Sequence, residues 1–346
     1  MRVDDFDYVL PEELIAQTPL LHRADSRLMV VDPISHSIQH SRFAQIENEL
    51  RAGDVLVLNN SRVIPARLFG VKPDTGGRIE IMLTRQIDDA TWEALCRPAK
   101  RFRAGMAVEF EGGGRARVLE EGEDGMRTLH FDLEESMESF LGRVGQVPLP
   151  PYIREPLGNP ERYQTVYAKP TGSVAAPTAG LHFTEDLLVR LAEKGVRIVE
   201  VTLHVGIGTF RPVQVDDVEA HKMHSEWYEI SPEAAHELNS AKRENRRIVA
   251  VGTTAMRTLE SAAQKGAIRP GADDTSIFIY PGYEFQIVDA LITNFHLPKS
   301  TLFMLVCAMM GTEFAKEVYG VAVTERYRFF SFGDAMFITR RHDEGA

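Results

Sequence analysis

The feature that most constrains the fold is an alternation of short apolar segments with amphipathic ones in the C-terminal half of the chain. The pattern predicts strands at 196–203, 248–251, 276–280, 288–292 and 328–338. Thr184 and Ser231 are expected to cap helices before and after the first of these strands, and Ser300 to begin a long buried helix that runs to about residue 319. Strands and helices that alternate in this way are typical of α/β proteins.

Five loops in the chain are rich in small and polar residues, and each contains a histidine or an arginine. They lie at 59–62, 172–184, 204–208, 252–257 and 293–296. Four of them follow predicted strands directly, the first after an apolar strand at 54–58, at the end where open α/β sheets bind ligands. One such loop also suits a tightly packed connection, and a single histidine is more often structural than catalytic. Five in one chain predict a pocket built from strand ends.

Residues 68–147 have a different texture, with short alternating runs separated by glycine clusters such as 112–114. This pattern predicts a small all-β barrel or sandwich. We therefore expect a discontinuous α/β domain at 1–67 and 148–346, with a β domain inserted at 68–147. The basic loop 97–103 within the insert suits contact with a phosphate backbone, although a solvated charged turn has the same composition.

Composition limits the class of protein further. A net charge of −11 disfavours an indiscriminate nucleic-acid coat, but local basic patches could still bind RNA. Cys96 and Cys307 are far apart, which argues against a cysteine-rich zinc site and favours a reducing compartment. The acidic N-terminus is unlike a signal peptide, and the longest apolar run, 302–310, is too short to span a bilayer. A cytoplasmic protein without a membrane partner is expected.

Common catalytic motifs do not fit. Gly206 and Gly208 lack the third glycine of a dinucleotide fingerprint, and Ser173 is outside a nucleophile elbow. A metal site is not expected, because the chain has no zinc-binding helix motif. The alternative of a metal-dependent hydrolase would rest on His221, His224 and Glu226.

Several longer segments, in order along nearly the whole chain, carry a resemblance to a known family. They lie at 59–67, 145–153, 161–168, 172–184, 203–210, 251–254, 293–298 and 333–336. The sequence resembles the S-adenosylmethionine:tRNA ribosyltransferase-isomerases of the queuosine pathway. The resemblance implies a barrel-like α/β main domain with an inserted small antiparallel β-barrel. A monomer is expected.

The resemblance also implies a reaction. The family transfers and isomerises the ribosyl part of S-adenosylmethionine onto the aminomethyl group of a 7-deazaguanine at the tRNA wobble position. The product is epoxyqueuosine in tRNA, and adenine and methionine are released. S-adenosylmethionine is then a co-substrate, tRNA is the partner and no metal is required. A non-catalytic tRNA-binding protein that uses the β insert as its platform is the alternative.

The chemistry suggests roles for the polar loop residues. A neutral histidine suits removal of the proton that the sulfonium acidifies, and we expect His182 or His204 to be this base. Asp289 or Asp334 would hold a hydroxyl group. Expected cofactor contacts are Thr178, Thr253, Thr254, Arg257 and Asn294. Expected tRNA contacts are Arg23, Arg27, Arg62, Arg97, Lys100 and Arg101.

Overall fold

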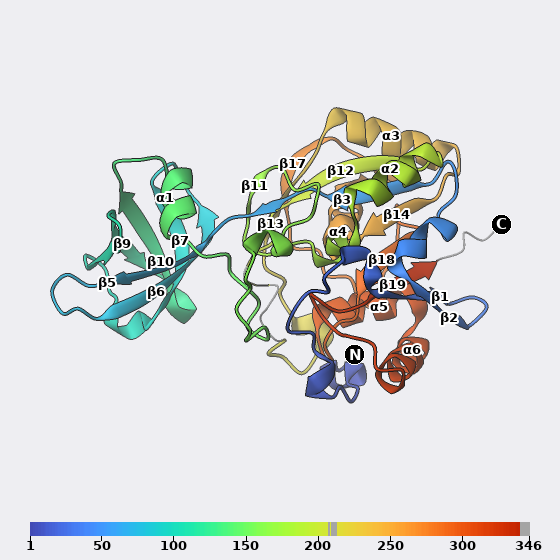
Figure 1. Cartoon of the computed structure of the whole chain (residues 1–346), viewed down its shortest axis with the longest axis horizontal. Helices are drawn as coiled ribbons and strands as arrows, with labels where there is room; N and C mark the ends of the chain where they lie inside the picture. Colours follow the sequence, from blue (N-terminus) through green and yellow to red (C-terminus); the bar gives the residue numbers. More distant parts are fainter. Residues whose placement is uncertain (207, 209–212, 340–346) are drawn as a thin grey trace. The chain divides into compact units, whose positions relative to one another are not determined.

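The computed structural model describes residues 1–206, 208 and 213–339. The chain forms two compact units (Figure 1). The main unit comprises Met1–Arg62, Pro151–Pro170 and Ala176–Ala346. The barrel unit comprises Val63–Pro150 and Thr171–Ala175.

The main unit is built on one large sheet, which has nine strands in the described part of the chain. Their order is β17-β13-β12-β3-β14-β18-β19-β1-β2. The central strands β12, β3, β14 and β18 are parallel; β19 is antiparallel to β18 and parallel to β1. The bounds are β1 Arg27–Asp32, β2 Ser37–Arg42, β3 Val55–Asn59, β12 Arg197–Leu203, β13 Glu226–Ile230, β14 Ile248–Val251, β17 Gly271–Thr275, β18 Ala290–Asn294 and β19 Ala335–Thr339.

Every residue of β3, β14 and β18 is buried, because both faces of the sheet are covered. On one face Leu56 and Val249 join a core with Phe43 of the 3₁₀ segment Phe43–Asn48 and Leu187 of α2 (Glu185–Glu193). Side chains alternate along a strand, so Val57 points to the opposite face. There α4 packs across β3, β12, β14 and β18; its bounds are Gly252–Ala262.

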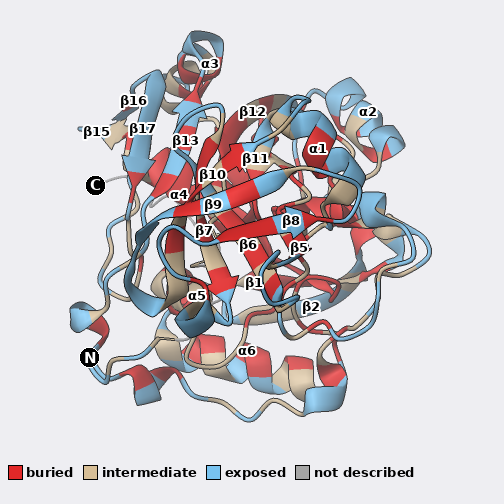
Figure 2. Cartoon of the chain, turned by 90° about the vertical axis from the view of Figure 1, so that its left-hand side faces the viewer, coloured by how far each residue is buried: buried red, intermediate tan, exposed pale blue. Residues whose placement is uncertain are grey.

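The helix starts read from the sequence have the expected caps. The hydroxyl of Thr184 accepts a hydrogen bond from the Leu187 amide at 3.2 Å, at the start of α2. Ser231 caps α3 (Pro232–Arg243), and Ser300 caps α5 (Thr301–Met310). The single helix predicted to residue 319 is in fact two helices, because Gly311 has φ +82 and begins α6 (Thr312–Thr324) anew. Figure 2 shows exposed residues along α2 and α3, where each helix turns one face to solvent.

Two predicted strands are misplaced. The segment 276–280 is not a strand; β17 ends just before it, at Thr275. The last strand begins at Ala335 rather than at 328. Asp334 explains the late start, because its carboxylate accepts the backbone N–H groups of Arg27 and Arg328 at 2.8 Å each and holds the chain in a turn.

The barrel unit is a closed antiparallel barrel in the order β10-β7-β6-β5-β8-β9, drawn with α1 in Figure 1. Its core contains Phe110, Phe131 and Phe140, with ring centroids 5.2–6.0 Å apart. The predicted fold class, α/β with an inserted antiparallel β-barrel, is confirmed. In the described residues the inserted sheet closes, whereas the main sheet has β17 and β2 as edge strands. The bounds are β5 Arg67–Val71, β6 Arg78–Gln86, β7 Thr91–Arg97, β8 Ala107–Phe110, β9 Arg115–Glu121, β10 Met126–Asp132 and α1 Met137–Val144; the short strands are β4 Arg62–Val63, β11 Thr171–Ser173, β15 Ala263–Gln264 and β16 Ala267–Ile268.

Candidate active site

The polar loops meet at one edge of the main sheet. The carboxyl ends of β3, β12, β14 and β18 lie at this edge because the four strands are parallel. The pairing of Asn294 with Ala335, and of Leu28 with Ala335, places the starts of β19 and β1 there too. We call this the polar edge. Six separate segments of the main unit therefore contribute residues to it.

One cluster at the polar edge is centred on Asn294 at the end of β18. The Thr178 hydroxyl donates to Asn294 Oδ1 at 3.0 Å, and Asn294 Nδ2 lies 3.0 Å from His182 Nε2. The same Nδ2 lies 3.5 Å from the carbonyl oxygen of Asp334, which can only accept a hydrogen bond. The amide nitrogen is therefore the donor to His182. Thr178 and His182 both belong to the 3₁₀ segment Thr178–His182, which packs on β18.

The hydrogen bonds of His182 define its tautomer. Since Nε2 accepts from Asn294, the proton is on Nδ1, which lies 2.7 Å from Ser26 Oγ. The ring is 5% exposed and packs on Phe43, with centroids 4.9 Å apart. Burial, with the nearby charges of Arg23 and Arg328, lowers the pKa of His182 to about 3. His182 is therefore a neutral residue with both ring nitrogens occupied.

His204, just after β12, has a different environment. Its half-buried ring stacks on Trp227, with centroids 5.1 Å apart and an interplanar angle of 19°. Its Nδ1 is buried and has no hydrogen-bond partner among the described residues. Burial lowers the pKa of His204 to about 4. Both ring nitrogens of His182 are hydrogen-bonded, whereas Nδ1 of His204 has no partner within the described residues. His204 is therefore the better candidate for the base.

Other buried polar atoms at the polar edge also lack partners in the described part of the chain. They are Ser61 Oγ after β3, and Thr254 Oγ1 and Arg257 Nη2 in α4. Buried polar atoms are nearly always hydrogen-bonded in folded proteins, so this set favours binding of a polar ligand. α4 begins directly after β14, so its first turn lies at the polar edge. This turn has no side-chain cap, which leaves its backbone N–H groups available there.

Arg257 is held by a buried ion pair that the sequence did not reveal. Its Nη1 contacts Glu226 Oε2, and the two side chains are 5% and 3% exposed. Glu226 Oε1 accepts the Gly206 N–H at 2.9 Å, in the loop after β12. Glu226 thus connects this loop to α4. In the described residues, no three His, Cys, Asp or Glu side chains come together in a group that could hold a metal ion.

Comparison with known proteins identifies the family. The family model described as queuosine biosynthesis protein matches residues 3–338. This chain belongs to the queuosine biosynthesis protein family. It is also similar to the crystal structure of S-adenosylmethionine tRNA ribosyltransferase from Thermotoga maritima, with 39% identity and a TM-score of 0.56. That match covers 96% of this chain and 99% of the other. The resemblance inferred from the motifs is confirmed.

Asp289 and Asp334, the two acidic residues expected at the site of this queuosine biosynthesis family member, both bind backbone N–H groups, at different places in the sheet. Asp289 precedes β18 and so lies at the opposite end of that strand from Asn294. Its carboxylate accepts the Ile248 N–H at 2.8 Å, at the start of β14. Asp334 does lie at the polar edge, but its carboxylate binds the backbone of the adjoining turn and the Arg27 side chain at 3.4 Å. The structure does not bring Asp289 together with the other candidates.

The basic residues expected to contact RNA are divided between the units. In the main unit, Arg27 is paired with Asp334, and Arg62 with Glu161 at 2.5 Å. In the barrel unit, Arg97, Lys100 and Arg101 are exposed. Thr253 is buried in the first turn of α4, beside the unpartnered Thr254 hydroxyl. The motif at 203–210 lies partly outside the described residues, which lack Ile207, Thr209 and Phe210.

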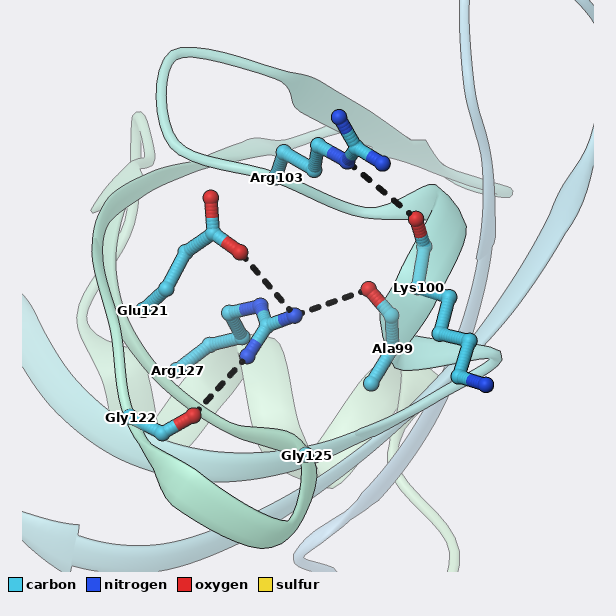
Figure 3. Close-up of a pocket in the computed structure, with 7 residues that line it drawn as sticks. All are labelled: Ala99, Lys100, Arg103, Glu121, Gly122, Gly125 and Arg127. Atoms are coloured by element: carbon cyan, nitrogen blue, oxygen red, sulfur yellow. Dashed lines mark hydrogen bonds and ion pairs between the residues drawn. The ribbon is translucent and has the colours of Figure 1, made fainter.

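The barrel unit has a pocket of about 460 Å³ (Figure 3). Arg127, 5% exposed, lies in its wall and donates to the carbonyls of Ala99, Phe102, Gly122 and Met126 at 2.6–3.4 Å. It also lies 3.4 Å from the Glu121 carboxylate. These contacts use all five N–H groups of the guanidinium, so Arg127 stabilises the surrounding turns. Lys100 and Arg103 supply the remaining positive charge of this pocket.

The buried histidines predict a marked loss of stability in mild acid. Burial lowers the pKa of both His182 and His296 to about 3, against 6.5 for a free histidine. The unfolded chain takes up protons that the folded chain does not, so the stabilisation is complete above pH 6.5 and is lost as the pH falls toward 3. We expect the unfolding free energy to fall by about 1.4 kcal/mol per pH unit for each histidine.

Urea unfolding at a series of pH values from about 7 to 5 measures this slope. His296→Gln is the informative variant, because the His296 ring is buried and is bonded at 2.8 Å to Thr293 of β18, only three positions before it. Its slope should be shallower than that of the wild type by the contribution of one histidine. Equal slopes in the two proteins would contradict the prediction.

Proposed function

We propose that this chain is an S-adenosylmethionine:tRNA ribosyltransferase-isomerase. It transfers and isomerises the ribosyl part of S-adenosylmethionine onto the 7-aminomethyl-7-deazaguanine wobble base of tRNA. Epoxyqueuosine-tRNA is formed, and adenine and methionine are released. The observation that carries the proposal is the polar edge, where buried unpartnered polar atoms from three strand-end loops converge in a member of the queuosine biosynthesis family.

The polar edge suits a co-substrate that has a carboxylate, a ribose and a purine. The uncapped N-terminus of α4 and the Thr253 and Thr254 hydroxyls offer donors to an anionic or hydroxyl oxygen. The unpartnered Nη2 of Arg257 adds a charged donor, and the ion pair with Glu226 fixes its position. These groups need no metal ion to bind such a molecule.

His204 is the general base in this proposal. The sulfonium of S-adenosylmethionine makes an adjacent carbon acidic, which allows a weak neutral base to remove the proton. His204 stays neutral at pH 7 because burial lowers its pKa, and its ring orientation is fixed by Trp227. His182 acts as a positioning residue: with Thr178 it holds the Asn294 amide in one orientation at the end of β18.

The wider arrangement follows from these roles. We propose that the main unit is the catalytic domain and that the barrel unit is a separate domain inserted into it, with Arg97, Lys100 and Arg101 as contacts for the tRNA backbone. One chain supplies every residue named at the polar edge, so we expect a monomer to be active. Because tRNA is the substrate, we place the enzyme in the cytoplasm. No helix in the described ranges is long and apolar enough to cross a membrane.

The decisive test is release of the two leaving groups. The protein is incubated with S-adenosylmethionine and a tRNA that carries 7-aminomethyl-7-deazaguanine at the wobble position. Adenine and methionine should appear in equal amounts, together with a heavier tRNA base. The same tRNA with guanine at that position is the control and should give neither product. Tight tRNA binding without adenine above the control would contradict the proposal.

A further inference from the structure

Three arginines of the main unit, Arg23, Arg162 and Arg328, bind backbone carbonyls rather than a carboxylate in the described residues. Arg23 donates to the carbonyls of Leu181 and Glu161 at 3.2 and 3.1 Å. Arg162 and Arg328 likewise donate to backbone carbonyls, those of residues 18, 20 and 21. No ion pair of these three side chains is found within residues 1–206, 208 and 213–339.

This lack of ion pairs is unusual in a chain with 50 acidic residues and a net charge of −11. Neighbouring arginines do have partners: Arg27 is paired with Asp334, and Arg62 with Glu161. Half-buried cations without a directly bonded counter-ion are costly to keep. Burial lowers the pKa of Arg23 and of Arg328, and the charge of Arg162 lowers the pKa of Arg23 further; the carboxylates of Glu161 and Asp334 oppose these shifts only in part. An anion bound among the three arginines would offset these costs.

The arginines also have donors to spare. Arg162 Nε and Arg328 Nη1 are buried and have no hydrogen-bond partner in the described part of the chain. A guanidinium has five N–H groups, and the carbonyl contacts use only some of them. Spare charged donors that face a common ligand give strong hydrogen bonds to phosphate oxygens.

A small cavity of about 30 Å³ lies beside two of these arginines. Arg23 and Arg162 line it together with Ser26, Ser331, His182 and the backbone of Gly333. Arg328 is close enough that its charge lowers the pKa of His182. The cavity has room for about one oxygen atom or water molecule, and is too small for a nucleobase. It therefore suits a group that inserts an oxygen while the rest of the molecule stays outside.

We propose that this cavity is a subsite for one phosphate group of the tRNA strand, beside the base that reacts. The inference rests on the proposed function, which places the tRNA at the polar edge. His182 connects the two places, since its ring lines the cavity and its Nε2 binds Asn294 of the polar edge. A phosphodiester offers two oxygens that share one negative charge to the guanidiniums of Arg23 and Arg162, with the charge of Arg328 nearby. It leaves the nucleotides on either side free to reach other parts of the surface.

Binding of a fluorescent anticodon stem-loop RNA with guanine at the wobble position tests the subsite without any turnover. Arg162→Gln and Arg328→Gln should each weaken binding roughly tenfold or more, as expected for loss of a charged hydrogen bond. Each should also make the dependence of log Kd on log salt shallower by about 0.7 to 0.9. Arg190→Gln is the matched control, because Arg190 is exposed on α2 and paired with Glu47; it should change neither quantity.

Replacing one phosphate at a time in the RNA loop with a neutral methylphosphonate locates the contact. At one position the substitution should weaken binding to the wild-type protein about tenfold and have no further effect on Arg162→Gln. This coupling depends on position, so a general disturbance of the fold would not reproduce it. The inference is overturned if no position shows it, or if the arginine variants lose affinity for S-adenosylmethionine but not for the RNA, since the anion would then be the cofactor carboxylate.

The two proposals can fail separately. Normal adenine release by the wild type with no coupled phosphate position would remove the subsite and leave the enzyme assignment intact. Absence of adenine release with a coupled position would remove the enzyme assignment and leave an RNA-phosphate site on the protein.

Discussion

Replacement of His204 with glutamine should reduce adenine release by roughly 100- to 10,000-fold, the range typical for loss of a general base. The side chain of glutamine retains polarity but cannot take up a proton. The structural basis is the buried Nδ1 of His204, which lacks a partner in the described residues, on a ring that Trp227 holds by stacking. Binding of S-adenosylmethionine should change much less than turnover.

Steady-state adenine release at saturating substrates measures the effect, and a thermal melt confirms that the variant is folded. His236→Gln is the matched control, because His236 is exposed on α3 and should be silent. His182→Gln should cost less than His204→Gln, since it disturbs the orientation of Asn294 and leaves the base in place. Turnover by His204→Gln within a few-fold of the wild type would show that the base lies elsewhere.

The pH profile gives an independent check on the same assignment. His204 with a pKa of about 4 is unprotonated at neutral pH and remains so in mild acid. His204 should therefore contribute no fall in kcat/KM near pH 6.5, where an unperturbed histidine titrates. Protonation of the aminomethyl group of the substrate gives a separate pH dependence, which His204→Gln should share. A fall centred near pH 6.5 that disappears in His204→Gln would mean that His204 is not desolvated in the working enzyme.

Local sequence patterns were sufficient to predict the α/β class and most of the strands and helix starts. The apolar runs of β3, β14 and β18 are continuous because these strands are buried on both faces. Thr184, Ser231 and Ser300 could be identified as helix caps because a cap acts within three residues. The polar loops after the strands could also be recognised, because their composition is visible in the local sequence. Parallel strands necessarily bring such loops to one edge of the sheet.

The partners within the site could not be predicted, because they depend on contacts between distant segments. His182 meets Ser26 across 156 positions and Asn294 across 112. No local pattern shows that these bonds occupy both of its nitrogens. Ser26 had one usable signal, a polar residue immediately before an apolar strand that starts at the polar edge. The expectation for Asp289 failed geometrically, because β18 begins after it and carries Asn294, not Asp289, to the polar edge.

The ion pair between Glu226 and Arg257 predicts the largest effect on stability. Glu226→Gln keeps the shape of the side chain but leaves the Arg257 cation buried without its counter-ion. Breaking one side of a buried pair typically costs about 3–5 kcal/mol, and we expect the unfolding free energy to fall by this amount. The Gly206 N–H would also exchange a carboxylate acceptor for a weaker amide oxygen, which should loosen the loop that carries His204.

Urea unfolding compares this variant with Glu47→Gln, which breaks the exposed pair with Arg190 and should cost less than about 1 kcal/mol. The double variant Glu226→Gln with Arg257→Met removes the uncompensated cation. It should regain part of the stability that Glu226→Gln loses, because an apolar side chain is less costly there than an unpaired charge. The double variant should be inactive, since it lacks Nη2 of Arg257, which is a proposed ligand contact. Glu226→Gln as stable as Glu47→Gln would show that the Arg257 charge is balanced by other groups.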